Sequence, residues 1–299
     1  MTQSKSGRPV EIFGYPIWNS SEDAKNARQA CWCPFMERRC TRTTRLTGIP
    51  LGVCSVEFQG GFHPICKDRF AEAVESTTVA RVLDDIGRHY FGDMVYALPL
   101  TDVTLPRQDV IDCVLLRKKV LLPEVEDFTI IERQTIPVVR PGALAQGLRD
   151  FLEGVDVQNG SYGFDLSIDR WTQKAIARLF SSGLVCEAWN TKCYWILEKR
   201  LFQVLVTQYS FESDAFSPEH PVRFAVYELI PLHDRLVLKL VRFTSTSMDE
   251  IDRALRVSLV TLSRDEFVEG LNRQWVKTIK HELRLAIARK IREKQATGF

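Results

Sequence analysis

The chain of 299 residues is 45% hydrophobic and 26% charged, and its formal net charge is +2. These proportions are typical of a globular protein and exclude a largely disordered chain. The length allows one large domain or two modest ones. No apolar run approaches the roughly 18 residues of a membrane span, and the N-terminus lacks the apolar core of a signal peptide. We therefore expect a cytoplasmic protein.

Basic side chains gather near both ends of the chain, around a nearly neutral middle. The later group occupies residues 273–294, and the earlier group consists of Lys25, Arg28, Arg38, Arg39, Arg42 and Arg45. Such groups are typical of proteins that bind a polyanion. A solvated surface explains them equally well, so charge alone leaves both interpretations open.

The first predicted helix begins after Ser20 or Ser21, either of which can cap it, and runs toward Arg28. A polar segment follows that cannot form a core of its own and carries Cys31, Cys33, Cys40, Cys54 and Cys66. In a reducing cytosol, a dense cysteine cluster favours metal ligation over disulfides, and four thiolates suit a tetrahedral zinc or iron ion. Cys31 competes with Cys33 for the first position, and His63 is an alternative to one sulfur. The simpler explanation is a set of buried free cysteines.

Amphipathic spacing predicts one or two helices over residues 67–92, ending at Gly92. Three short runs rich in β-branched and aromatic residues then predict consecutive strands at 94–98, 110–116 and 128–131, separated by turns that include Pro99. We expect a helix at 141–151, with proline at its start. Another is expected from Asp169 to Gly183, where glycine closes the helix.

The second half of the chain continues this mixture of helices and strands. Residues 193–197 predict a strand, and residues 200–206 fit either a strand or a helix. Residues 223–230 and 235–241 predict a hairpin, and a further helix begins near Thr246. A last long helix carries an apolar stripe that we expect to contact the core or a second subunit: Phe267, Leu271, Trp275, Ile279, Leu283, Ile287 and Ile291.

Two of the predicted strands carry polar groups where a buried strand should carry none. Alternation places Glu132 and Gln134 on one face and Arg133 on the other, with Asp112 on a neighbouring strand. Carboxylates on adjacent strands suit a magnesium ion, which can promote phosphodiester hydrolysis. Gln134 would orient the attacking water. The alternative is a chance placement of polar residues at strand edges.

Upstream of this set, Asp102 is a candidate for a further ligand, and Asp109 is its rival. Short motifs accompany these residues through most of the chain, thinly between about 140 and 215. They are Phe13-Gly14, Cys33-Pro34-Phe35, Cys40, Gly52-Val53-Cys54, Ile65-Cys66, Asp102 to Pro106, Asp112, Glu132 to Thr135 and Phe224 to Leu229. Together they resemble the NotI-type type II restriction endonucleases, a bacterial family.

The resemblance implies an α/β (α+β) fold, a PD-(D/E)XK nuclease core in its E-x-Q form. In that core a mixed sheet is flanked by helices. We expect a four-cysteine metal-binding segment at residues 1–75, followed by a nuclease domain with a helical C-terminal part at 76–299. The resemblance also implies that iron, or alternatively zinc, is held by Cys33, Cys40, Cys54 and Cys66, with Cys31 a bystander.

For the catalytic site, the resemblance implies magnesium bound by Asp112 and Glu132 and assisted by Gln134, which stands where the commoner nucleases have a lysine. Asp102 would take the place of a family glutamate. Arg133 departs from the family, which usually has an apolar residue there. The implied activity is magnesium-dependent hydrolysis of double-stranded DNA at a short palindrome.

Two-fold symmetric DNA is most simply matched by a homodimer, and a restriction-modification system would add a cognate DNA methyltransferase as partner. Candidates for DNA contact are Arg38, Arg39, Arg42 and Arg45. One alternative is a non-catalytic DNA-binding protein that keeps the nuclease core as a scaffold. Another is a metal-stapled interaction protein that does not bind nucleic acid.

Overall fold

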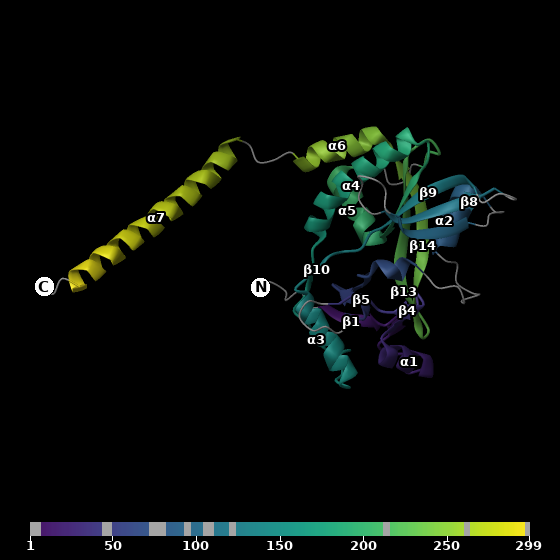
Figure 1. The fold of residues 1–299 in the computed structure, drawn as a ribbon, viewed down its shortest axis with the longest axis horizontal. Coiled ribbons are helices and arrows are strands. Elements are labelled where there is room, and N and C mark those ends of the chain that lie inside the picture. Colours follow the sequence, from purple (N-terminus) through teal and green to yellow (C-terminus); the bar gives the residue numbers. More distant parts are fainter. Residues whose placement is uncertain are drawn as a thin grey trace. The chain divides into compact units, whose positions relative to one another are not determined.

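The computed structural model describes residues 7–43, 50–71, 82–92, 97–103, 111–119, 124–211, 216–259 and 264–296. The chain forms two compact units, Met1–Leu255 and Arg256–Phe299. Helices and several sheets occur together in the chain, so the predicted mixed α and β class is confirmed (Figure 1). Among the residues described, no helix combines the length and the apolar character needed to cross a membrane.

A six-stranded mixed sheet forms the centre of the first unit, in the order β14-β13-β12-β9-β8-β7. Its strands are β7 (Ala97–Val103), β8 (Ile111–Lys118), β9 (Val125–Arg133), β12 (Cys193–Glu198), β13 (Val222–Leu232) and β14 (Arg235–Thr246). β7, β8 and β9 form an antiparallel meander. β12 runs parallel to both β9 and β13, and β14 pairs antiparallel with β13.

The strands predicted at 110–116 and 128–131 and the later hairpin are therefore confirmed. The first strand, predicted at 94–98, is described only from Ala97, and β7 continues to Val103. Pro99, expected in a turn, lies inside β7. This position is tolerated because β7 is an edge strand of the sheet, and an edge strand has a side on which no ladder hydrogen bond needs the missing N–H. The prediction failed because proline marks a strand edge as readily as a turn.

Helices cover both faces of the sheet, namely α2 (Val82–Phe91), α4 (Ile168–Ala188), α5 (Lys199–Tyr209) and α6 (Met248–Leu259). Alternate residues of β12 show this arrangement. Trp195 packs in the cluster that includes α4 and α5, and Tyr194 packs in the cluster that includes α2. Every residue of β12 is buried, as expected for a strand covered on both faces.

Three helices correct, complete or confirm the sequence prediction. α4 passes through Gly183 and ends at Ala188, so this glycine does not close the helix. A Cβ at Gly183 would lie 2.5 Å from Sδ of Met248, so the glycine leaves room for this side chain where α6 packs closely against α4. The segment that fitted either strand or helix forms α5, and α2 ends before Gly92 as expected.

The N-terminal part contains short elements: β1 (Gly7–Ile12), β2 (Tyr15–Pro16), α1 (Glu22–Ala30), β3 (Trp32–Cys33), β4 (Arg38–Arg39), β5 (Val53–Phe58), β6 (Gly61–Pro64) and the 3-10 helix η1 (Lys67–Phe70). Ser21 caps α1 by accepting from the backbone N–H of Ala24 at 3.3 Å. Phe13 and Val53 bury their side chains in the same cluster as Trp195. The N-terminal part thus shares its core with the central sheet.

The remaining elements of the first unit are β10 (Val138–Val139), α3 (Pro141–Leu152) and β11 (Asp165–Leu166). Proline opens α3, as the sequence predicts. The domain boundary expected near residue 75 lies within residues 72–81, which are outside the described residues. It therefore stays a prediction.

The second unit contains α7 (Arg264–Ala296). Its predicted apolar stripe is exposed, with Trp275 64% and Leu283 60% accessible. Four-residue spacing predicts an apolar face but not what covers it, so the expected contact of this stripe with the core stays a prediction. A contact with a second subunit stays a prediction.

Candidate functional site

Two carboxylates meet at one end of the central meander. Asp112 is the second residue of β8 and Glu132 is the penultimate residue of β9. The antiparallel register pairs Cys113 with Ile131, so the two acids lie one step further along the same pair of strands. Both face a cavity of about 570 Å³ that is lined by Lys67, Asp112, Glu132, Gln134, Pro137, Trp171, Lys174, Ala175, Ala177, Arg178 and Ser181.

Asp112 is held by two donors from different parts of the chain. Nζ of Lys67 lies 2.9 Å from each of its carboxylate oxygens, and the backbone N–H of Arg133 donates to Oδ2 at 3.0 Å. Lys67 is the first residue of η1, directly after Cys66. The cysteine segment therefore supplies the cation that faces this acid.

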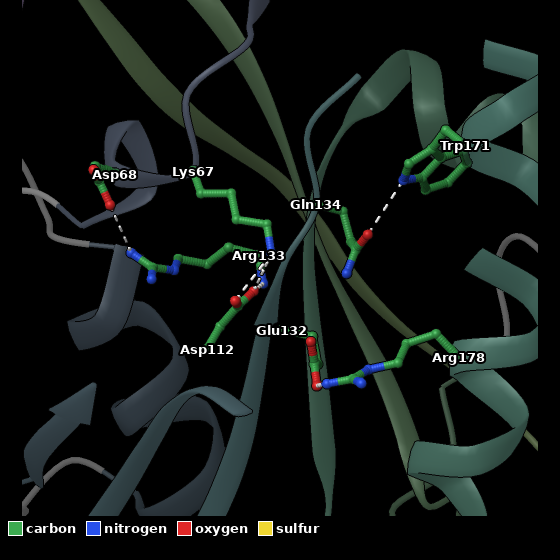
Figure 2. Close-up of polar contacts among 8 residues, drawn as sticks. All are labelled: Lys67, Asp68, Asp112, Glu132, Arg133, Gln134, Trp171 and Arg178. Carbon is green, nitrogen blue, oxygen red and sulfur yellow. Dashed lines mark hydrogen bonds and ion pairs between the residues drawn. The ribbon is translucent and has the colours of Figure 1, made fainter. Parts of the chain in front are cut away.

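Glu132 is more deeply buried, with only 5% of its side chain accessible. Burial raises the pKa of Glu132; Nη2 of Arg178, 2.7 Å from Oε1, lowers it, and the charge of Asp112 raises it again. Figure 2 shows Lys67 and Arg178 approaching the two carboxylates from different sides. The site therefore holds two close acids, each matched by one basic side chain.

Gln134 follows directly after β9, and its side chain is oriented by Trp171. The indole Nε1 donates to Oε1 of Gln134 at 3.2 Å. An indole N–H can only donate, so the glutamine presents its oxygen to Trp171 and its NH₂ group faces away from the ring (Figure 2). Gln134 can therefore donate hydrogen bonds to a water or phosphate oxygen in the cavity.

Arg133 points away from the cavity, as alternation along the strand predicts. Its Nη1 lies 3.6 Å from Oδ1 of Asp68, and its side chain is only 7% accessible. Its Nε has no hydrogen-bond partner among the described residues. The charge is thus buried at the end of an interior strand, where η1 provides a partner.

The backbone of β7 brings a third acidic position to the same place. Thr101 pairs with Cys113 and Val103 with Ile111, so Asp102 lies between these pairs on the strand next to Asp112. For Asp102 the structure describes the backbone alone. Asp109 lies outside the described residues.

Sequence reasoning missed the three basic side chains and the tryptophan of the cavity. Trp171, Lys174 and Arg178 are spaced by three and four along α4, which places them on one helix face; this spacing was a usable signal. Lys67 gave no such signal. Its proximity to Asp112 arises from tertiary structure between segments that are 45 residues apart.

The four cysteines that the resemblance singles out come together in the fold. Cys33, Cys40, Cys54 and Cys66 line one cavity of about 10 Å³, room for roughly a single water-sized sphere. Cys31 is not among the lining residues. Burial raises the pKa of the Cys54 thiol well above its usual range and that of Cys33 to about 11, so a cation would be needed to hold these sulfurs as thiolates.

The donor chemistry of this cavity suits zinc or iron, because four sulfurs are soft ligands. No group of three or more Cys, His, Asp or Glu side chains in the described ranges has the spacing of a metal-bound set. The shared cavity, rather than preformed ligand geometry, is therefore what supports a metal here.

His63 does not take the place of a sulfur, which corrects that alternative. Its Nδ1 lies 2.9 Å from both carboxylate oxygens of Glu198, and its Nε2 lies 3.1 Å from the carbonyl oxygen of Phe58. Both ring nitrogens are thus engaged within the buried core.

Three of the candidate DNA-contacting arginines, Arg38, Arg39 and Arg42, line the cysteine cavity. Arg38 and Arg39 form β4, and both are exposed. Arg42 donates from Nη1 to the carbonyl oxygen of Val53 at 3.2 Å and lowers the pKa of the Cys66 thiol, which burial raises. Arg42 is therefore engaged with the cysteine segment, and Arg45 lies outside the described residues.

Comparison with models of known protein families and with curated proteins gave no match. What supports a function is therefore the arrangement of the residues themselves.

Proposed function

We propose that the protein is a magnesium-dependent type II restriction endonuclease that hydrolyses double-stranded DNA at a short palindromic site. The observation that carries the proposal is the placement of Asp112 and Glu132. They lie on adjacent strands at one end of the meander and face one cavity with Gln134 and three basic side chains. The mixed sheet with helices on both faces supports the proposal, because it is the architecture that the resemblance implies.

Asp112 and Glu132 would hold the magnesium ion. Their oxygens are hard ligands of the kind that magnesium prefers, and a cation between them would oppose the burial and repulsion that raise the pKa of Glu132. When bound, the ion polarises the phosphate and favours hydroxide formation from water. Asp102, whose backbone lies beside Asp112, is proposed as a further ligand.

The remaining side chains of the cavity would bind and orient the DNA backbone. The NH₂ group of Gln134 can donate to the attacking water or to a phosphate oxygen. Lys174 and Arg178, on one face of α4, add positive charge where a phosphate would lie. An open cavity of about 570 Å³ admits a phosphodiester group with its neighbouring sugars.

In the same proposal, Cys33, Cys40, Cys54 and Cys66 hold iron, with zinc as the alternative. The ion would fix a segment that is otherwise built from short strands and turns. Arg38 and Arg39 would contact DNA from this segment. The working enzyme would be a homodimer in the bacterial cytoplasm, partnered by a cognate DNA methyltransferase.

The test is incubation of the purified protein with phage and genomic DNA in the presence of magnesium. We expect discrete fragments that disappear in Asp112→Ala and in Glu132→Ala. Glu126→Ala is the matched control, because Glu126 lies on β9 as well but is 46% accessible and pairs with Arg117. Smeared or absent cleavage on DNA of varied sequence would contradict the proposal.

A second candidate function is a DNA-binding protein that keeps this core without catalysis. The observation that favours it is that each acid already has a basic partner, Lys67 for Asp112 and Arg178 for Glu132. Ion pairs of this kind also occur as purely structural features. Sequence-specific DNA binding that persists without cleavage, and that is unchanged by magnesium, would support this function instead.

A further inference from the structure

We propose that Lys67 is a catalytic residue of this site, supplied by the cysteine segment, and that its ammonium group contacts a non-bridging oxygen of the scissile phosphate. The inference rests on the proposed nuclease function and deepens it. Glu132 and Gln134, at the end of β9, supply one charged and one neutral side chain to the cavity. A neutral amide donates hydrogen bonds but contributes no positive charge, and Lys174 and Arg178 both belong to α4, so positive charge beside Asp112 has to come from another segment.

The position of Lys67 meets this need. Its Nζ lies 2.9 Å from both oxygens of Asp112, the carboxylate proposed as a metal ligand. A group that hydrogen-bonds this carboxylate is within reach of a phosphate bound at the same place. The charge of Lys67 also reaches Glu132, whose pKa it lowers. Lys67 therefore acts electrostatically on both acids of the site.

The backbone that carries Lys67 is fixed on both sides. Before it, the N–H groups of Ile65 and Cys66 donate to the carbonyl oxygen of Cys54 at 3.0 and 3.2 Å. After it, Arg69 is only 2% accessible and forms a 3.0 Å ion pair with the fully buried Glu11. The Cα of Lys67 is thus held in place by buried contacts.

The side chain itself is free to change partners. It is 50% accessible, and the ion pair with Asp112 reaches solvent. Exposed pairs of this kind are weak, so a negatively charged phosphate can compete with Asp112 for the ammonium. A fixed backbone with a side chain that can change its ion-pair partner is expected of a residue that contacts the substrate when the substrate binds.

In the hydrolysis, the water oxygen forms a bond to phosphorus and the bond from phosphorus to the leaving sugar oxygen breaks. The leaving oxygen keeps the bonding electron pair and takes a proton from solvent, and the attacking water gives up a proton to solvent. Negative charge builds up on the non-bridging oxygens in the transition state. Lys67 would stabilise that charge while staying protonated, and removal of one such donor costs about 10²–10³-fold in rate.

The experiment compares wild type with Lys67→Met, Lys67→Arg and Lys119→Met. Lys119 is the matched control, because it is also 50% accessible and pairs with Glu124 at 2.6 Å, beyond the opposite end of β8. Single-turnover cleavage is measured at saturating magnesium, DNA affinity is measured in calcium, and manganese affinity without DNA is measured by electron paramagnetic resonance. Circular dichroism checks folding.

For Lys67→Met we expect a fall in the saturating cleavage rate of about 100-fold or more, with DNA affinity changed only a few-fold. Manganese affinity should rise, because a competing cation has been removed from Asp112. Lys67→Arg should recover part of the rate, and Lys119→Met should match wild type in all three measurements.

If Lys67→Met binds manganese more tightly but cleaves at the wild-type rate, Lys67 is only a counter-ion and the inference is overturned. Parallel losses in Lys67→Met and Lys119→Met would overturn it as well, since they would reflect a general effect of surface charge. If wild type itself does not cleave, the nuclease function fails first, which distinguishes the two failures.

Discussion

Arg178 reaches from α4 to Glu132 on β9, and its Nη2 lies 2.7 Å from the carboxylate Oε1. The glutamate is buried, whereas the arginine is partly open to the cavity. The positive charge of Arg178 compensates the negative charge of this buried acid. The contact therefore couples the stability of the fold to the chemistry of the cavity.

Arg178→Met should lower the free energy of unfolding by about 1–3 kcal/mol at neutral pH, because it leaves a buried acid without its charged donor. Glu132→Gln in the same chain should recover part of this loss, since the amide carries no charge. Urea unfolding of the two single variants and the double variant measures the coupling. Arg117→Met, which removes the half-buried partner of the exposed Glu126, should change stability less than Arg178→Met does. Strict additivity of Arg178→Met and Glu132→Gln would contradict the predicted coupling.

The cysteine cavity predicts one bound metal ion per chain. Metal analysis of the purified protein should find iron or zinc, and a visible absorption band would identify iron. Cys54→Ser should lose the metal, because Cys54 lines the cavity, whereas Cys31→Ser should keep it because Cys31 does not. Loss of metal in both variants, or a metal-free wild type, would contradict this prediction.

His89 predicts a dependence of stability on pH. Burial, and to a smaller extent the charge of Arg223, lowers the pKa of His89 to about 4. Tyr194 accepts from Arg223 at 2.8 Å, and its hydroxyl lies 2.6 Å from Nδ1 of His89. The hydroxyl can therefore donate to the neutral ring.

Because the pKa of His89 in the folded state is lower than in the unfolded state, the unfolded chain binds the proton more tightly. The stabilisation is complete above the unfolded value near 6.5, falls as the pH drops below it, and is lost below about 4. We expect a contribution of about 1–2 kcal/mol once solvent exposure is allowed for. His89→Asn should reduce the pH dependence of the free energy of unfolding between about pH 4 and pH 6.5. An unchanged slope in this variant would mean that another group causes it.

Gly183 predicts a steric effect at the contact between α4 and α6. Gly183→Val should destabilise the fold by about 1–3 kcal/mol, because its Cβ would meet Sδ of Met248. Adding Met248→Ala should relieve part of that strain. Gly270→Ala is the control, because a Cβ there meets nothing within 4 Å, and it should increase helix content in α7. Thermal unfolding and circular dichroism measure both effects.

Much of the fold was predictable from local pattern. The meander and the hairpin follow from β-branched runs, and the starts of α1 and α3 follow from Ser21 and Pro141. The errors share one cause, because Pro99 and Gly183 were interpreted as local breaks. Their real roles depend on the edge position of β7 and on the packing of α6, which only tertiary structure reveals.

The candidate site was predictable only in part. Misplaced polar groups identified Asp112, Glu132 and Gln134, since alternation along a strand fixes which residues share a face. Lys67 and Arg178 were missed. Contacts between a strand and a distant segment depend on how the chain crosses itself, and single-sequence periodicity carries no information about that.

The ion pair between Lys67 and Asp112 also has a consequence for how such a chain can evolve. The two residues lie in segments that carry different sequence motifs, yet the charge of each neutralises the charge of the other. Recombination between the segments would leave the carboxylate without its cation. The cysteine segment and the strand pair should therefore be inherited together, and a search for relatives should require both.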